Sequence, residues 1–122
     1  MVTNTELDSR VSTRLAEDQL YRALAARPRR RILYHLLDKS SASRAELARI
    51  LAGWRADESE IMVTGAEHKD ILLELHHSHL PQLDESELIQ YNREAGVVTL
   101  QSLGADVQQL IRSSIEAESP DR

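Results

Sequence analysis

Apolar residues recur at every third or fourth position over most of the chain, which is the spacing of amphipathic helices. The pattern predicts a first helix over residues 14–26 and a second over Pro28–Asp38. Proline is favourable in the first turn of a helix, where its missing N–H group has no acceptor within the helix. A serine-rich turn over residues 39–43 is expected to follow.

Two capping boxes predict where the next helices begin. Ser43–Glu46 and Thr64–Glu67 each place a hydroxyl residue three positions before a glutamate, so that the two side chains satisfy free N–H groups of the first turn. We expect the first of these helices to end at Gly53 and a loop over residues 54–63 to follow. The second contains Pro81, which predicts a kink or a break there because proline lacks the N–H group that a helix requires.

The sequence then changes to a β pattern. Leu88–Tyr91 and Val97–Leu100 are rich in β-branched and aromatic residues, and Gly96 lies near the turn between them, as in a β-hairpin. Residues 103–115 return to helical spacing with one apolar stripe. This order of elements predicts a mainly α fold with a small β-hairpin, namely a winged helix-turn-helix with an added C-terminal helix.

The same patterns predict how the chain is divided. We expect a flexible N-terminal arm over residues 1–13 and the winged helix-turn-helix domain over residues 14–101. A C-terminal helix over residues 102–117 and a tail over residues 118–122 would complete the chain.

Composition narrows the classes of protein. The chain has 122 residues, with 20 Asp and Glu against 15 Lys and Arg and a net charge of −5. Lys39 and Lys69 are its only lysines, a bias that either a very salty cytoplasm or a genome favouring arginine codons would explain. Because the sequence lacks a membrane-length apolar run, an apolar segment typical of secretory signals and any cysteine, we expect a cytoplasmic protein.

Catalytic and metal-binding patterns are missing from the sequence. It contains neither a glycine-rich phosphate loop nor a nucleophile motif. His68, His76, His77 and His79 lack the spacing of a zinc site, and only His76 and His79 share a helix face. We therefore expect no enzymatic activity, no cofactor and no metal, and we interpret His79 as a histidine that faces the core.

Two segments resemble a known family. Ala25–Leu33 is similar to the A-x-x-x-R-R-x-I-L motif of winged-helix regulators of the ArsR type, and His77–Leu83 with Leu88–Ile89 is similar to their recognition segment. The HSHLPQL string also resembles a winged-helix family of halophilic archaea in which H-x-H-L-P-x-L recurs. The resemblance covers about residues 15–101 and implies a DNA-binding regulator. Glu87 stands where the pattern has glycine, and the cysteines of metal-sensing members are missing.

The resemblance and the order of elements together predict a transcriptional regulator that binds double-stranded DNA. Its recognition helix, about residues 66–85, would lie in the major groove, while the arginine cluster and the wing contact the backbone. The side chains expected to contact DNA are Arg29, Arg30, Arg31, His68, Lys69, His77, Ser78, Gln82 and Arg93. An alternative for the arginine cluster is pairing with acids such as Glu17 and Asp18 of the first helix.

The exposed face of the recognition helix favours a different function. Asp70, Glu74 and Glu85 lie on that face and would repel phosphate. The alternative function is therefore a protein–protein interaction module that keeps the winged-helix scaffold without binding DNA.

The closing helix suggests a homodimer, because its stripe of large aliphatic residues exceeds what a small domain covers. The residues of this stripe are Leu103, Val107, Leu110, Ile111 and Ile115. The alternative is that the stripe packs against the first helix of its own chain.

Overall fold

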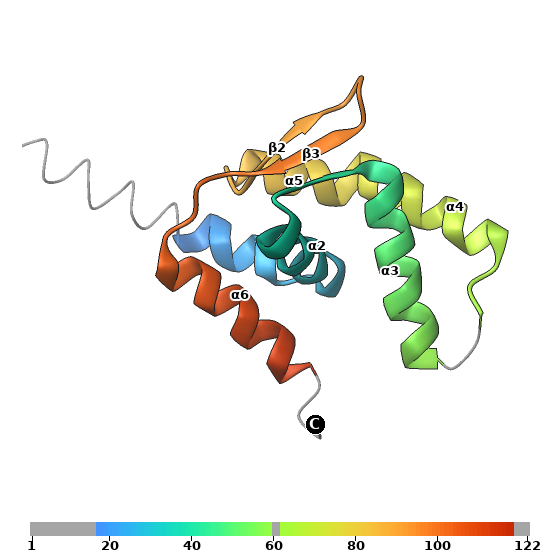
Figure 1. Cartoon of the computed structure of the whole chain (residues 1–122), viewed down its shortest axis with the longest axis horizontal. Coiled ribbons are helices and arrows are strands. Elements are labelled where there is room, and N and C mark those ends of the chain that lie inside the picture. The colour runs from blue at the N-terminus through green and yellow to red at the C-terminus, as the bar shows by residue number, and fades with distance from the viewer. Residues whose placement is uncertain (1–16, 60–61, 119–122) are drawn as a thin grey trace, which may run out of the picture.

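The computed structural model describes residues 17–59 and 62–118 (Figure 1). The expected arm over residues 1–13, the first residues of the first helix and most of the tail therefore lie outside the described residues. Residues 17–24 are helical. The elements that follow are α2 (Arg27–Lys39), β1 (Ser41–Ser43), α3 (Arg44–Ser59), α4 (Gly65–Glu74), the π-helical turn η1 (Leu75–His79), α5 (Leu80–Glu85), β2 (Ile89–Asn92), β3 (Val97–Leu100) and α6 (Ala105–Ala117).

The strands form a three-stranded antiparallel sheet in the order β1-β3-β2. The predicted hairpin is confirmed as β2 and β3, and it forms the wing. The segment expected to be a serine-rich turn contributes β1, which pairs Ala42 with Val98. Serine and alanine have weak strand propensity, so β1 depends on the free edge of β3 rather than on its own residues.

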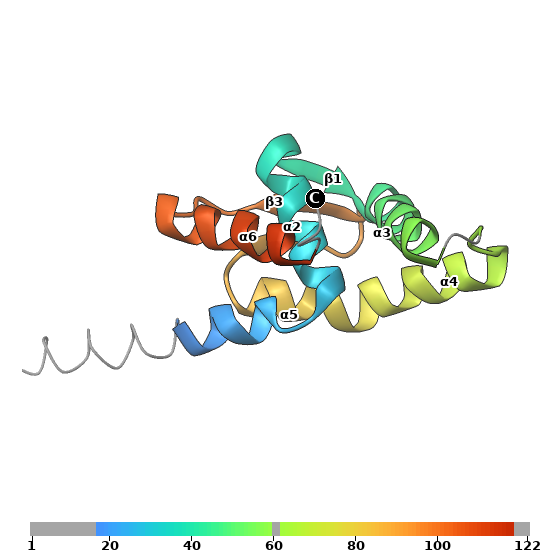
Figure 2. The same ribbon diagram turned by 90° about the horizontal axis from the view of Figure 1, so that it is seen from below.

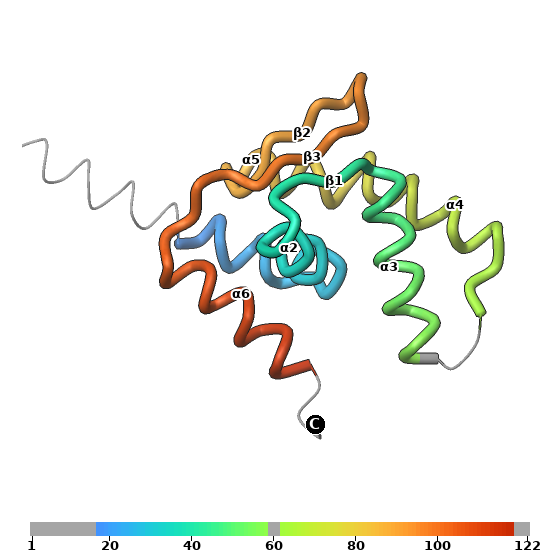
Figure 3. The backbone as a smooth tube through the Cα atoms, in the orientation of Figure 1, coloured from blue at the N-terminus to red at the C-terminus, as the bar shows by residue number. Residues whose placement is uncertain are grey.

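Helix α2 occupies the middle of the molecule, between α3 and α6 and beneath the sheet (Figures 1 and 3). Its Ile32, Leu33 and Leu36 are fully buried, as is Val98 on the inner face of the sheet. Seen from below, α4, η1 and α5 form one long helical run (Figure 2). This arrangement confirms the predicted fold class: mainly α with a small antiparallel sheet, in a winged helix-like arrangement with a C-terminal helix.

The end predicted for α3 is wrong. The helix continues past Gly53 to Ser59, so the predicted loop begins later than residue 54. An interior glycine costs a helix only about 1 kcal/mol. Trp54, one residue further on, is partly buried and stacks on Arg31 of α2, and this packing outweighs the glycine penalty.

The interruption expected at Pro81 takes the form of a π-helical turn rather than a break. In η1 the backbone N–H of Leu80 bonds to the carbonyl oxygen of Leu75, five residues earlier. Since Pro81 cannot donate a hydrogen bond, a wider turn just before it lets the helix continue into α5.

The apolar stripe of α6 packs against α2 of the same chain. Ile111 and Ile115 are buried, while Leu103 and Val107 are partly buried against the core. Leu110 is the one residue of the predicted stripe that is exposed, at 37%. The chain therefore covers most of the surface assigned to a dimer, although through α2 rather than through the first helix.

Candidate nucleic-acid interface

The predicted recognition helix corresponds to the run α4–η1–α5. Lys69, His77 and Ser78 are exposed on it, and His68 is partly buried. The remaining predicted residue of this helix, Gln82, is partly buried and lies within 3.5 Å of the Ser86 hydroxyl. Lys69, His77 and Ser78 are therefore free to meet a partner, whereas Gln82 is directed toward the end of its own helix.

A group of side chains meets where the wing, α3 and η1 come together. Arg44 donates from Nη1 to the Tyr91 hydroxyl at 2.5 Å, and the same nitrogen lies 3.3 Å from His76 Nδ1. The Tyr91 hydroxyl is 2.7 Å from His76 Nδ1, and Arg44 Nη1 is 3.4 Å from the Arg93 carbonyl oxygen. His77 stacks edge-on against His76, with 4.9 Å between the ring centroids. We call these five residues the wing-junction cluster.

Local structure explains why the cluster forms. Ser43 caps α3 by accepting a hydrogen bond from the Glu46 N–H at 3.0 Å, so α3 begins at Arg44. The Arg44 backbone N–H donates to the Gly96 carbonyl oxygen at 2.7 Å, which attaches the start of α3 to the turn of the wing. Gly96 has a φ of 69°, a conformation that glycine adopts without the strain of a side chain.

The wing-junction cluster is electropositive. In the part of the chain that the structure describes, Arg44 and Arg93 form no ion pair with a carboxylate. Burial lowers the pKa of His76, and the positive charges of Arg44, His77 and Arg93 lower it further. His76 is therefore neutral at pH 7, and a bound anion would favour its protonation.

Arg29 and Arg30 bond to carbonyl oxygens at the end of the preceding helix. Arg29 donates to the carbonyl oxygens of Ala23 and Arg22, each at 2.9 Å, and Arg30 donates to that of Leu24 at 2.8 Å. The two arginines thus satisfy the last carbonyl groups of residues 17–24, which have no partner inside that helix.

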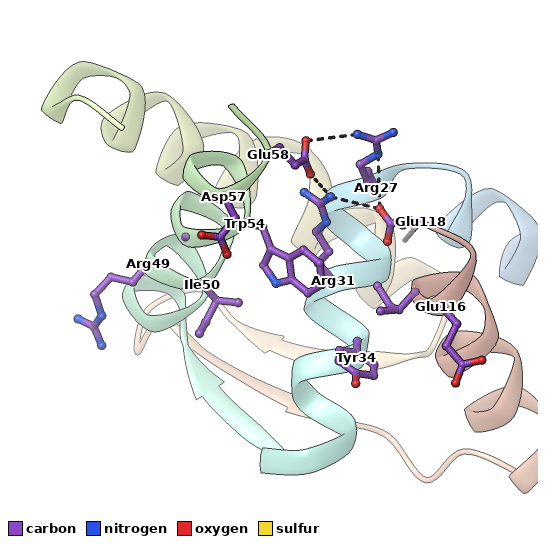
Figure 4. Close-up of a pocket in the computed structure, with 12 residues that line it drawn as sticks. Arg27, Arg31, Tyr34, Arg49, Ile50, Trp54, Asp57, Glu58, Glu116 and Glu118 are labelled. Carbon is purple, nitrogen blue, oxygen red and sulfur yellow. Dashed lines mark hydrogen bonds and ion pairs between the residues drawn. The ribbon is translucent and has the colours of Figure 1, made fainter. Parts of the chain in front are cut away.

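Carboxylates pair with Arg27, Arg30 and Arg31. Arg27 and Arg31 both contact Glu58 and Glu118, so the alternative of internal pairing describes them, although not with the expected Glu17 and Asp18. Figure 4 shows these pairs between α2, α3 and the end of α6. The placement of Arg31 on the DNA backbone needs correction, because its side chain is 8% exposed and stacks on Trp54.

The wing and the end of α6 lie on different sides of the molecule. Figure 1 shows the wing on one side of α2 and the end of α6 on the other. Arg30 and Arg31 pair with Glu118 just beyond the end of α6, whereas Arg29 lies 3.5 Å from His79 in η1.

His79 occupies the environment expected for a histidine that faces the core. It is partly buried, and its Nδ1 lies 3.5 Å from Arg29 Nη1. Burial lowers its pKa, Arg29 lowers it further and Glu74 raises it in part. No grouping of three or more His, Asp or Glu side chains that could hold a metal occurs in residues 17–59 and 62–118.

Sequence reasoning missed Arg44, His76 and Tyr91 as a group. Their separations of 15 to 47 residues leave no local motif. The one available signal was the capping box, since Ser43 at the cap places Arg44 in the first turn of a helix. Glu58 and Glu118, which pair with the arginine cluster, were missed for the same reason.

No helix within the described ranges combines the length and apolar character that a membrane crossing needs.

Comparisons with known proteins place this chain in a family. No curated protein and no solved structure matches the chain. A family described as a domain of unknown function, DUF7344, matches residues 21–99, from within the first helix to β3, which is more than half of the chain. The protein therefore belongs to the DUF7344 family.

Proposed function

We propose that this protein is a DNA-binding transcriptional regulator. The run α4–η1–α5, about residues 66–85, would lie in the major groove, and the wing would follow the backbone. The observation that carries the proposal is the wing-junction cluster: the positive charges of Arg44 in α3 and Arg93 in the wing turn both act on His76 of η1, and neither arginine has a carboxylate partner among the described residues.

Arg44 is the best placed of these residues for a phosphate group. All its side-chain hydrogen bonds to the described residues run through Nη1, so Nε and Nη2 remain available as donors. A guanidinium with two such donors matches the geometry of a phosphate. Tyr91 holds this guanidinium in place, which reduces the entropy lost when an anion binds.

The other side chains that would contact DNA are exposed ones. Lys69, His77 and Ser78 would face the groove and Arg93 the backbone beside the wing. Salt would screen the repulsion between phosphate and the acidic residues Asp70 and Glu74. A homodimer would double this surface, and Leu110 is the exposed residue of α6 from which such contact would begin.

DNA binding is tested by fluorescence polarisation with duplexes from the upstream region of its own gene, over a range of KCl concentrations. We expect sequence-dependent binding at micromolar protein. Arg44→Gln should weaken it about tenfold and reduce the salt slope by about one phosphate contact. Arg112→Gln on α6 is the matched control, since this exposed arginine lies beside residues of α2 and α3 rather than beside the wing.

Two outcomes would contradict the proposal. One is the lack of any sequence-dependent binding by the wild-type protein across the salt range. The other is equal loss of affinity in Arg44→Gln and Arg112→Gln, which would reduce the effect to net charge alone.

A protein–protein interaction module remains the second candidate, and the surface of α4 and of the segment before it favours it. Leu73 is 50% exposed and Met62 is 85% exposed, and Asp70 and Glu74 are exposed beside Leu73. An apolar residue framed by carboxylates suits a basic partner. Leu73→Ser should then reduce capture of a protein partner while leaving DNA affinity unchanged.

A further inference from the structure

A cavity of about 950 Å³ lies between α2, α3 and the end of α6 (Figure 4). Its apolar wall consists of Tyr34, Ile50, Trp54 and Ile115. This volume lies in the range of small-molecule sites, roughly 300–1,000 Å³, which are mostly apolar with a few fixed polar groups.

The polar end of the cavity is built to hold a carboxylate. Arg27, Arg30 and Arg31 all approach one oxygen, Oε1 of Glu118, at 3.3 to 3.4 Å. Glu58 contacts Arg27 and Arg31 from the other side. Three guanidinium groups around one oxygen form an anion site, and in this structure the chain fills the site with its own side chain.

Glu118 fills this site incompletely. Both its carboxylate oxygens are buried, yet neither makes a hydrogen bond to a described residue in addition to the ion pairs. Arg31 Nε is also buried and unpartnered, although its side chain is 8% exposed and lines the cavity. Buried donors and acceptors without partners carry a desolvation cost, so a better-fitting anion would displace Glu118.

Glu118 is free to leave without unfolding a helix. It lies just beyond the end of α6, at its C-cap position. Once it has left, the four arginines of the cavity and its polar end outnumber the three remaining carboxylates, Asp57, Glu58 and Glu116; the arginines are Arg27, Arg30, Arg31 and Arg49. A ligand with one negative charge would then replace the charge that Glu118 supplied.

We propose that this cavity binds an organic anion, namely a carboxylate attached to an apolar body about the size of an aromatic ring. The ligand carboxylate takes the place of Glu118 among Arg27, Arg30 and Arg31. Its apolar body packs against Trp54, Ile50 and Ile115. Binding forms and breaks no covalent bond, and it frees the end of α6 from α2.

Trp54 is the only tryptophan of the chain and lines this cavity, so its fluorescence reports on changes there. Benzoate, titrated at constant ionic strength, should change its emission in a saturable manner. Acetate lacks the apolar body and benzyl alcohol lacks the charge, so each should bind at least about tenfold more weakly.

Variants of Glu118, Glu116 and Arg31 distinguish binding of benzoate at the arginines from nonspecific contact with Trp54. Glu118→Ala removes the internal competitor and should tighten benzoate binding several-fold. Glu116→Ala is the matched control, because Glu116 lines the same cavity but takes part in none of the arginine pairs. Arg31→Met should abolish binding.

The proposal fails if benzoate at roughly 10 mM leaves Trp54 emission unchanged in both the wild type and Glu118→Ala. It also fails if benzyl alcohol binds as tightly as benzoate. If Arg31→Met does not fold, the comparison of benzoate affinity between Glu118→Ala and Glu116→Ala still tests the proposal, because only Glu118→Ala should bind more tightly. DNA binding measured on the same samples keeps the two proposals apart, since neither requires the other.

Discussion

At the scale of single residues, environment decides what each histidine can do. His76 and His79 look alike in the sequence, three positions apart in one histidine-rich segment. Burial lowers the pKa of both, but His76 faces Arg44, His77 and Arg93, whereas His79 lies between Arg29 and Glu74. His76 therefore has only positive charges among the groups that shift its pKa, whereas a carboxylate partly opposes the arginine beside His79.

These lowered pKa values predict how stability depends on pH. Below the ordinary histidine pKa of 6.5, the unfolded chain binds protons that His76 and His79 in the folded chain do not. The free energy of unfolding should therefore fall as the pH drops below 6.5. Urea denaturation between pH 5 and 7 should show a shallower dependence in His79→Gln than in the wild type. The exposed control Ser78→Gln should keep the wild-type slope, and the same slope in all three proteins would contradict the prediction.

DNA binding should show the opposite dependence on pH. A phosphate beside His76 stabilises its protonated form, so the complex binds more protons than the free protein. Affinity should rise as the pH falls from 7.5 to 6, and His76→Gln should remove most of this rise. Polarisation titrations at fixed KCl measure it, and a wild-type affinity that is independent of pH would remove His76 from the interface.

At the scale of elements, some turns and helix ends need a positive φ, and the residue type indicates this at some positions but not at others. Gly96 in the wing turn has a positive φ, as glycine readily adopts. Glu87 also has a positive φ, of 61°, at the position where the resemblance expects glycine. Hydrogen bonds hold it there: the Glu87 N–H donates to the Asp84 carbonyl oxygen and the Leu88 N–H to that of Leu83. The helix-terminating turn is therefore kept at the cost of some strain.

Releasing that strain should stabilise the protein. Glu87→Gly is expected to raise the free energy of unfolding by about 1 kcal/mol, because a side chain in the left-handed region costs about that much. Glu94→Gly, an exposed change in the wing turn at a residue without positive φ, should lower it slightly. Urea denaturation measures both, and a loss of stability in Glu87→Gly would mean that its side chain contributes more than its strain costs.

At the scale of the whole molecule, α6 is a part of the core. Ile111 is fully buried against the rest of the chain, while its neighbour Leu110 is 37% exposed. The same holds for charged residues, because in the folded chain Arg31 pairs with Glu58 and Glu118 and stacks on Trp54. Only the positions of the elements determine which apolar and which charged side chains remain available to a partner.

A pair of neighbouring substitutions distinguishes packing within the chain from dimerisation. Ile111→Ala should lower the free energy of unfolding by about 2 to 5 kcal/mol, and Leu110→Ala by much less. If α6 also joins two copies, the cost of Leu110→Ala should grow with protein concentration, and sedimentation should show a smaller assembly. Equal costs at all concentrations for the two variants would contradict the observed burial of Ile111.

The candidate sites differ in how much of each could be predicted from the sequence. The winged-helix order and the exposed residues Lys69, His77 and Arg93 could be predicted, because periodicity and turn residues act over a few positions. The wing-junction cluster and the cavity beside Trp54 could not. Both depend on contacts between residues far apart in the chain, such as Arg44 with Tyr91 and Arg31 with Glu118.

The sequence by itself determined the helices, the hairpin and the fold class, since hydrophobic spacing, capping boxes and Gly96 act locally. Tertiary structure alone decided that residues 41–43 form a strand, that α3 runs past Gly53 and which arginines remain free. The physical reason is that pairing with β3, packing of Trp54 on Arg31 and neutralisation by Glu118 are supplied by distant parts of the chain. Their energies exceed the weak local preferences that a sequence pattern records.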